Sequence, residues 1–177
     1  LQQLGLAEDT LVIFTSDNGS KGESGGSNAP LRGNKGTTWE GGMRVPCIMY
    51  WPGTLEEGVV CDQLISSVDF YPTLAQLAGA DIPGERKIDG LDFSKMLFDL
   101  ENEKSPREVF CYYNENSLEA IRVGKWKLHI RKNDQEINEL YDLKNDIGET
   151  KNLYKQKSDV VAKIEKIIDK VRNDLGD

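Results

Sequence analysis

The sequence predicts an α/β fold in two parts: strands of a mainly parallel sheet, then a small antiparallel sheet covered by a C-terminal helix. Continuous apolar runs at residues 9–16 and 44–51 are typical of buried parallel strands. Residues 109–143 alternate aromatic and β-branched segments with polar turns, as antiparallel strands do. An apolar stripe at helical spacing follows between residues 158 and 175.

The elements of the first half are assigned from the residues that bound them. The first run fits a strand buried on both faces, and Pro52-Gly53 ends the second strand. Between them, residues 19–42 hold eight glycines in 24 positions, and a loop this long in a compact chain is usually functional or disordered. A helix is expected from Asp69 as N-cap to Gly79, and a shorter helix at 92–99.

The second half is assigned from segments with strand composition and from one clear helix. The expected strands are the segments Val109–Tyr113, Ala120–Ile130 and Ile137–Leu143. Ser158 is expected to begin the last helix, which ends at Gly176. We therefore expect two domains: residues 1–106 as part of an α/β domain, and residues 107–177 as the sheet-and-helix subdomain.

The composition of the chain argues against some classes of binding partner. The formal net charge of −8 at pH 7 argues against a nucleic-acid surface, because phosphate binding needs clustered Lys and Arg. No apolar run approaches the length of a membrane span. Cys47, Cys61 and Cys111 lack C-x-x-C spacing, and we expect buried thiols. The chain opens at Leu1 without an initiator Met or a signal sequence, so we expect it to begin within a longer protein.

Asp17 and Asn18 stand at the end of the first strand, and Lys35 lies in the glycine-rich loop that follows. Neither a Walker loop, nor a G-x-G-x-x-G motif, nor an EF-hand matches this order of residues. Two interpretations stay open. A carboxylate beside an amide carbonyl suits calcium or magnesium at the carboxyl end of a strand. Alternatively, Asp-Asn-Gly simply makes a turn and Lys35 is a solvated cation.

Several long motifs, in the same order along the chain, resemble one family. They are DTLVIFTSDNGS, NAPLRGNKGTTWEGGMRVPCIMYWPG, SSVDFYPTLAQLAGADIP, IDGLDFSKML, AIRVGKWKLH and ELYDLKNDIGETKNL. Together they cover nearly the whole chain and resemble the second half of sulfatases, in the alkaline-phosphatase-like superfamily. The resemblance implies the C-terminal part of an alkaline-phosphatase-like sulfatase fold, and an enzyme that hydrolyses sulfate esters.

The resemblance also implies roles for individual residues. Asp17 and Asn18 correspond to ligands of the active-site calcium, and Lys35 to the catalytic and substrate-binding lysine that contacts the sulfate oxygens. Trp39, Glu40 and Arg44 lie in the same block, and we assign them to support of the loop. The only histidine, His129, matches no catalytic position of the family and is expected to be structural. A sulfated glycan is one candidate substrate, and the family is usually periplasmic or extracellular.

Other family features do not occur in these 177 residues. No proline lies within a Cys/Ser-x-Pro-x-Arg motif, the source of the formylglycine nucleophile, and the companion aspartates of the calcium site do not occur. We therefore expect a C-terminal portion that needs the N-terminal part of the same enzyme, is inactive alone, and exposes an apolar patch at Leu11–Phe14 or self-associates. The alternatives are a phosphoester or phosphonate hydrolase of the same superfamily and a non-catalytic binding module.

Overall fold

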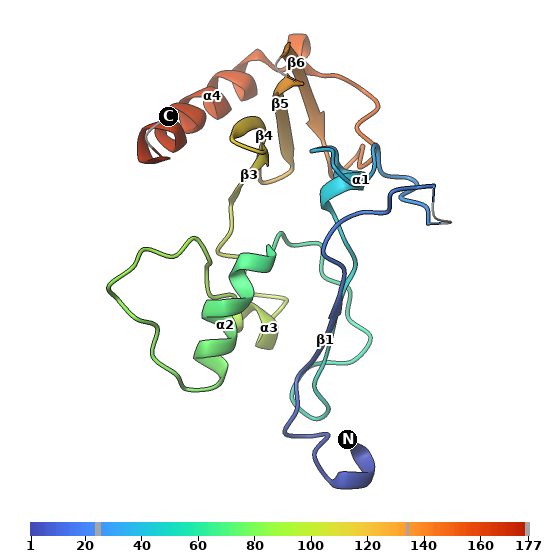
Figure 1. The fold of residues 1–177 in the computed structure, drawn as a ribbon, viewed down its shortest axis with the longest axis vertical. Helices are drawn as coiled ribbons and strands as arrows, with labels where there is room; N and C mark the ends of the chain where they lie inside the picture. Colours follow the sequence, from blue (N-terminus) through green and yellow to red (C-terminus); the bar gives the residue numbers. More distant parts are fainter. Residues whose placement is uncertain (24–25, 134, 176–177) are drawn as a thin grey trace. The chain divides into compact units, whose positions relative to one another are not determined.

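The computed structural model (Figure 1) describes residues 1–23, 26–133 and 135–175. They form two compact units, and each is considered by itself: unit 1 contains residues 1–14 and 47–108, and unit 2 contains residues 15–46 and 109–177. The glycine-rich loop therefore belongs to the same unit as the second sheet. The sequence-based domain boundary after residue 106 stays a prediction.

Unit 1 contains two short strands and two short α-helices. Its elements are η1 (Gln2–Leu4), β1 (Val12–Thr15, whose last residue lies in unit 2), β2 (Cys47–Tyr50), η2 (Ser67–Asp69), α2 (Phe70–Leu77) and α3 (Ser94–Phe98). β1 and β2 pair as a two-stranded sheet. The expected strands at 9–16 and 44–51 and the expected helix at 92–99 are therefore present, each over a shorter range.

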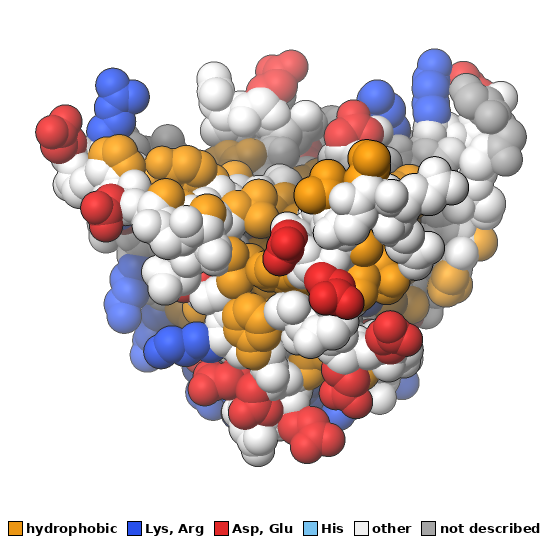
Figure 2. Space-filling model, turned by 90° about the horizontal axis from the view of Figure 1, so that it is seen from below, with side chains coloured by type: hydrophobic (Ala, Val, Ile, Leu, Met, Phe, Trp, Pro, Cys, Tyr) orange, Lys and Arg blue, Asp and Glu red, His pale blue; other side chains and the backbone are white. Residues whose placement is uncertain are grey.

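The first strand has the composition of a strand buried on both faces, but in this chain both strands are largely exposed. Phe14 is 66% exposed and Ile48 is 59% exposed, and the thiols of Cys47 and Cys61 are exposed rather than buried. A sheet of only two strands leaves most of its side chains without neighbours. Val12 is exposed together with Phe14, as expected for an apolar patch at this strand. Figure 2 shows hydrophobic side chains gathered over the face that it views.

Asp69 occupies the N-cap position of α2, as expected, but its side chain makes no capping hydrogen bond to this helix. The turn η2 precedes α2, so the backbone of Asp69 is already helical. Ser66 and Asp69 form a reciprocal capping box instead, with Ser66 N donating to Asp69 Oδ2 at 2.8 Å. The buried Asp69 carboxylate also accepts a hydrogen bond of 2.7 Å from Arg107 Nε.

Unit 2 is built on a four-stranded antiparallel sheet and a long helix. Its elements are α1 (Glu40–Met43), β3 (Val109–Asn114), β4 (Ser117–Val123), β5 (Trp126–Lys132), β6 (Gln135–Asp142), η3 (Tyr154–Gln156) and α4 (Ser158–Leu175). The strands pair in chain order as a meander. The segment Ala120–Ile130, expected as one strand, is two strands, because Gly124 adopts a φ of +55° and turns the chain.

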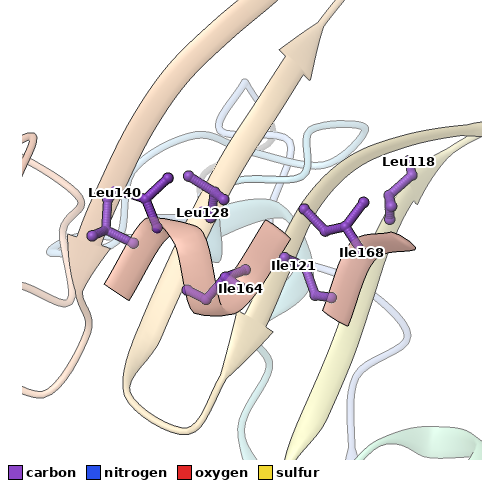
Figure 3. Close-up of a cluster of buried hydrophobic side chains, with 7 residues drawn as sticks. Leu118, Ile121, Leu128, Leu140, Ile164 and Ile168 are labelled. Carbon is purple, nitrogen blue, oxygen red and sulfur yellow. The ribbon is translucent and has the colours of Figure 1, made fainter. Parts of the chain in front are cut away.

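The helix α4 covers one face of this sheet, as predicted. The core residues are Leu118, Ile121, Leu128, Leu140, Val161, Ile164 and Ile168. Ile121 lies opposite Leu128, and Leu128 lies opposite Leu140, so one apolar row crosses three strands. Figure 3 shows Ile164 and Ile168 of α4 beside this row. The expected helix end at Gly176 lies outside the described residues.

The apolar residues of α4 form a single stripe and the rest of its surface is polar, as in a helix that covers a core. None of the described helices is long and apolar enough to cross a membrane. The second sheet and its helix are therefore held together chiefly by the burial of one apolar layer between them.

Truncation of the core should destabilise this unit strongly. Ile164 is 2% exposed, so we expect Ile164→Ala to lower the free energy of unfolding by about 3 kcal/mol, through lost apolar burial and the cavity left behind. Urea denaturation followed by circular dichroism measures the change. Ile48→Ala is the matched control at an exposed isoleucine, with an expected change within about 0.5 kcal/mol. Equal losses in the two variants would contradict the assigned core.

Candidate functional site

The residues expected to form a site lie on one long loop between β1 and β2. Asp17 and Asn18 follow β1 directly, and Lys35 lies in the second half of the loop. The side chains of Asp17 and Lys35 are exposed, and Asn18 is half-buried. Within the described residues, neither Asp17 nor Lys35 forms an ion pair, so both charges are available to a ligand.

The turn that carries Asp17 and Asn18 packs closely against α1. Ser16 Oγ donates to Asn18 O at 3.0 Å, which fixes the shape of the turn. Gly19 N donates to Gly42 O at 3.0 Å. A Cβ atom at Gly19 would lie 1.8 Å from Gly41 O, so only glycine permits this approach of the two backbones.

The second half of the loop folds back onto the first. Lys35 N donates to Ser20 O at 3.1 Å, which brings the Lys35 backbone beside the residue two positions after Asn18. The side chain of Asn28 links the two halves of the loop. Its Oδ1 accepts a hydrogen bond from Ser20 N at 2.7 Å. Its Nδ2 donates to Ser20 O at 2.8 Å and to Gly33 O at 3.2 Å. The structure thus brings the three expected site residues into one folded loop.

The short helix α1, which the sequence did not predict, rests on a group of charged residues with exposures of at most 1%. We call Glu40, Lys127, His129 and Glu149 the buried charge cluster. Lys127 Nζ lies 2.9 Å from Glu40 Oε1 and 3.1 Å from Glu149 Oε1. His129 Nε2 lies 2.7 Å from Glu149 Oε1. Glu149 Oε2 accepts from the backbone N–H of Glu40 at 2.7 Å, at the start of α1.

The expected support role of Glu40 thus extends beyond its pair with Arg44. Arg44 lies 3.8 Å from Glu40 Oε2, whereas Tyr112 OH donates to Glu40 Oε1 at 2.9 Å. Sequence reasoning missed Lys127 and Glu149. One signal was available: Lys127 and His129 alternate along a strand and must share a face of the sheet.

His129 is neutral in this cluster. Burial lowers its pKa well below the usual range, and the nearby charge of Lys127 lowers it further. The hydrogen bonding agrees, because Nδ1 is buried without a partner among the described residues, and a proton there would leave an unsatisfied donor. Nε2 therefore carries the proton and donates to Glu149. The structural role expected for His129 fits these contacts.

A second group of contacts ties the loop to the sheet beside the cluster. Thr38 Oγ1 donates to Glu119 Oε2 at 2.6 Å, and Lys132 pairs with the same oxygen at 3.1 Å. The Trp39 ring lies 4.0 Å from the ring of His129 between centroids, and Arg32 Cζ lies 3.6 Å from the Trp39 centroid. Residues 38–40 therefore all have partners on the sheet or in the loop.

The side-chain oxygens of Asp17 and Asn18 are of the type that binds a hard cation. A carboxylate and an amide carbonyl are ligands that calcium accepts, but calcium takes six to eight oxygens and this pair supplies only part of them. Among the described residues, no group of three or more His, Cys, Asp or Glu side chains could hold a metal ion. Asp17 and Asn18 can therefore contribute to a calcium site but do not complete one.

Comparisons with known proteins match this chain to one family. A family model described as N-sulphoglucosamine sulphohydrolase, C-terminal, matches residues 34–174. Steryl-sulfatase of Mus musculus is 45% identical over 130 residues, covering 69% of this chain and 21% of that protein. N-acetylgalactosamine-6-sulfatase of Mus musculus is 44% identical over 134 residues, covering 73% of this chain and 25% of that protein.

A solved structure agrees with the sequence matches. The PsFucS1 sulfatase from Pseudoalteromonas sp. superimposes with a TM-score of 0.82 at 30% identity, covering 98% of this chain and 39% of that one. The chain therefore belongs to the sulfatases, and within them to the C-terminal family named above for N-sulphoglucosamine sulphohydrolase. The resemblance seen in the sequence motifs is confirmed. The chain spans about a quarter of the length of the two mouse relatives.

The neutral state of His129 predicts how stability depends on pH. The unfolded chain binds a proton at His129 below about pH 6.5, whereas the folded chain does not, because its pKa is lowered. The free energy of unfolding should therefore fall as the pH drops from 6.5 to 5, by about 1.4 kcal/mol per pH unit from this group. Urea denaturation at a series of pH values measures the slope.

His129→Gln is the control for this pH dependence, because its amide can still donate to Glu149 but does not titrate. The slope between pH 6.5 and 5 should flatten in this variant. Hydrogen bonds lower the pKa values of Glu119, Asp142 and Asp146, so the stability that these groups contribute is lost chiefly below pH 5. An unchanged slope in His129→Gln would show that His129 is not the responsible group.

Proposed function

We propose that this chain is the metal- and sulfate-binding C-terminal portion of a sulfate ester hydrolase. Asp17 and Asn18 would supply two oxygen ligands to calcium, and Lys35 would contact the sulfate oxygens. The observation that carries the proposal is the hydrogen bond from Lys35 N to Ser20 O, at 3.1 Å. It closes the loop so that the backbone of Lys35, an exposed cation without an ion-pair partner among the described residues, lies beside the segment that follows Asp17 and Asn18.

The chemistry of a sulfate ester explains why these residue types suit the site. Negative charge grows on the bridging oxygen and the sulfuryl oxygens as the ester bond breaks. A bound calcium polarises the sulfate when present, and an ammonium placed at its oxygens stabilises the same charge. The glycine-rich backbone lets Lys35 return to the strand end. No anionic side chain neutralises Lys35 among the described residues.

The nucleophile belongs to another part of the enzyme in this proposal. The sequence of this chain contains no Cys/Ser-x-Pro-x-Arg motif, so a formylglycine would come from the N-terminal part of the same protein. The relatives are named for a steryl sulfate and for a sulfated sugar, and their similar identities favour neither class. We propose a sulfated glycan as the first substrate to assay, and a periplasmic or extracellular location by family resemblance.

Two substitutions in the full-length gene product separate the proposed roles. Asp17→Ala should lose bound calcium and activity together. Lys35→Ala should keep the calcium and lose about 10²-fold in kcat, because it removes one group that stabilises the developing charge. Metal analysis by inductively coupled plasma mass spectrometry and turnover of an aryl sulfate measure both effects.

Lys21→Ala is the matched control for the lysine substitution. Lys21 is an exposed lysine of the same loop, and its side chain pairs with Glu23 at 3.3 Å, whereas Lys35 has no ion-pair partner among the described residues. Its substitution should leave kcat unchanged. If Lys35→Ala behaves as Lys21→Ala does, the assignment of Lys35 to the sulfate is wrong.

The 177-residue chain alone should bind calcium weakly or not at all. Two protein ligands replace little of the hydration shell of the ion, and calcium prefers six to eight oxygens. Isothermal titration calorimetry with calcium chloride tests this expectation. Micromolar affinity that survives Asp17→Ala would mean that the metal site lies on other residues.

A further inference from the structure

We propose that Glu149 and Lys127 are positioning residues, which fix α1 against the sheet and through α1 hold the Asp17-Asn18 turn and the Lys35 loop in place. This inference rests on the proposed function for its catalytic consequence. Neither residue lies in the loop: Lys127 is on β5, 87 positions from Glu40, and Glu149 follows β6, 109 positions from Glu40. Their effect must therefore pass through the contacts of α1.

The first step is that α1 links both parts of the candidate site. Gly42 O accepts from Gly19 N at 3.0 Å, directly after Asn18. Gly41 N donates to Arg32 O at 2.7 Å, three residues before Lys35. The backbone of one helical turn thus contacts the metal-ligand turn on one side and the lysine segment on the other.

The second step is that the buried charge cluster fixes α1 by its first residue. Glu149 Oε2 accepts the backbone N–H of Glu40 at 2.7 Å, and Lys127 Nζ pairs with the Glu40 side chain at 2.9 Å. The backbone and the side chain of Glu40 are therefore held by two different partners. A helix of four residues has little stability of its own, so these contacts determine where it lies.

The third step is that donors face both carboxylate oxygens of Glu149, so each oxygen is needed as an acceptor. Its Oε1 faces the donors of Lys127 and His129, at 3.1 Å and 2.7 Å, while Oε2 faces Glu40 N. Its backbone has a φ of +53°, which the preceding turn imposes through Glu149 N donating to Asp146 O at 3.2 Å. A neutral amide at this position would place an N–H group against one of three donors.

Glu149→Gln is therefore the discriminating variant, and hydrogen exchange of the 177-residue chain is a readout independent of activity. The amides of Gly19, Lys35, Gly41 and Gly42 donate the hydrogen bonds that hold the loop. We expect them to exchange at least tenfold faster in Glu149→Gln, as followed by NMR, while the amides paired between β4 and β5 keep their wild-type rates.

Ile164→Ala is the matched control, since it weakens the same unit without touching the cluster. It should accelerate the sheet amides at least as much as the loop amides. If Glu149→Gln gives this same pattern, Glu149 is merely structural and the inference is overturned. The double variant Lys127→Met/Glu149→Gln removes both charges together, and it replaces the single variant in every measurement if the latter does not fold.

Activity of the full-length protein then separates this inference from the proposed function. Glu149→Gln should lower kcat at least tenfold, and raised calcium should restore part of that loss if the ligand turn has loosened. Wild-type activity in Glu149→Gln would overturn the positioning role. A wild-type protein without sulfatase activity, whose loop amides still respond to Glu149→Gln, would overturn the proposed function and support the positioning of the loop.

Discussion

The carboxylate of Glu149 is the group that joins the loop of unit 2 to its sheet. It is buried, and its two oxygens face an ammonium, a neutral imidazole and a backbone amide. A buried carboxylate without such partners would be strongly destabilising, because it loses its hydration and gains nothing in return. Since the partners come from β5 and from α1, the charge is satisfied only when the sheet and the loop are both in place.

This dependence follows from the composition of the loop. Its glycines make it flexible, and it contains few apolar side chains that could form a core of its own. Order must therefore come from polar anchors, which the loop obtains from Asn28 internally and from Thr38 and Glu40 on the sheet. The sheet can serve as a support because α4 covers its other side with a conventional apolar core. One face of this small sheet thus packs against α4 and stabilises the unit, and the other face positions the loop.

The sequence predicted the elements whose apolar residues recur at regular spacing, and the family whose long motifs it contains. The stripe of α4 and the composition of β3 to β6 predicted the second sheet and its helix, and the motif around Lys35 predicted the family. The apolar sequence of β1 alone indicates a buried strand, because an apolar strand looks the same with or without neighbouring strands. Its exposed patch was expected only because the family resemblance implies a further N-terminal part. Asp69 was placed correctly at the N-cap of α2, but its side chain caps the preceding turn η2, which has no strong sequence signal.

The buried charge cluster was missed for a related reason. A lysine in a strand and a glutamate in a polar turn usually remain in water, so neither Lys127 nor Glu149 stands out locally. Only the three-dimensional arrangement shows that they meet, more than twenty positions apart, under α1. The short helix α1 begins with Glu40 and continues with two glycines. Glycine has a low helix propensity, so this sequence does not favour a helix. Tertiary contacts, not local preference, therefore create this element.

The glycines of α1 explain why the poor propensity is tolerated. A Cβ atom at Gly41 would lie 2.4 Å from Gly33 O, and one at Gly42 would lie 2.1 Å from Thr37 O. Larger residues would favour the helix but force the loop away from it. The backbone contact between Gly42 and Gly19 would then be lost, and with it the link to Asn18. The sequence thus favours close backbone approach over helix stability, and the buried charge cluster supplies the stability that the helix lacks.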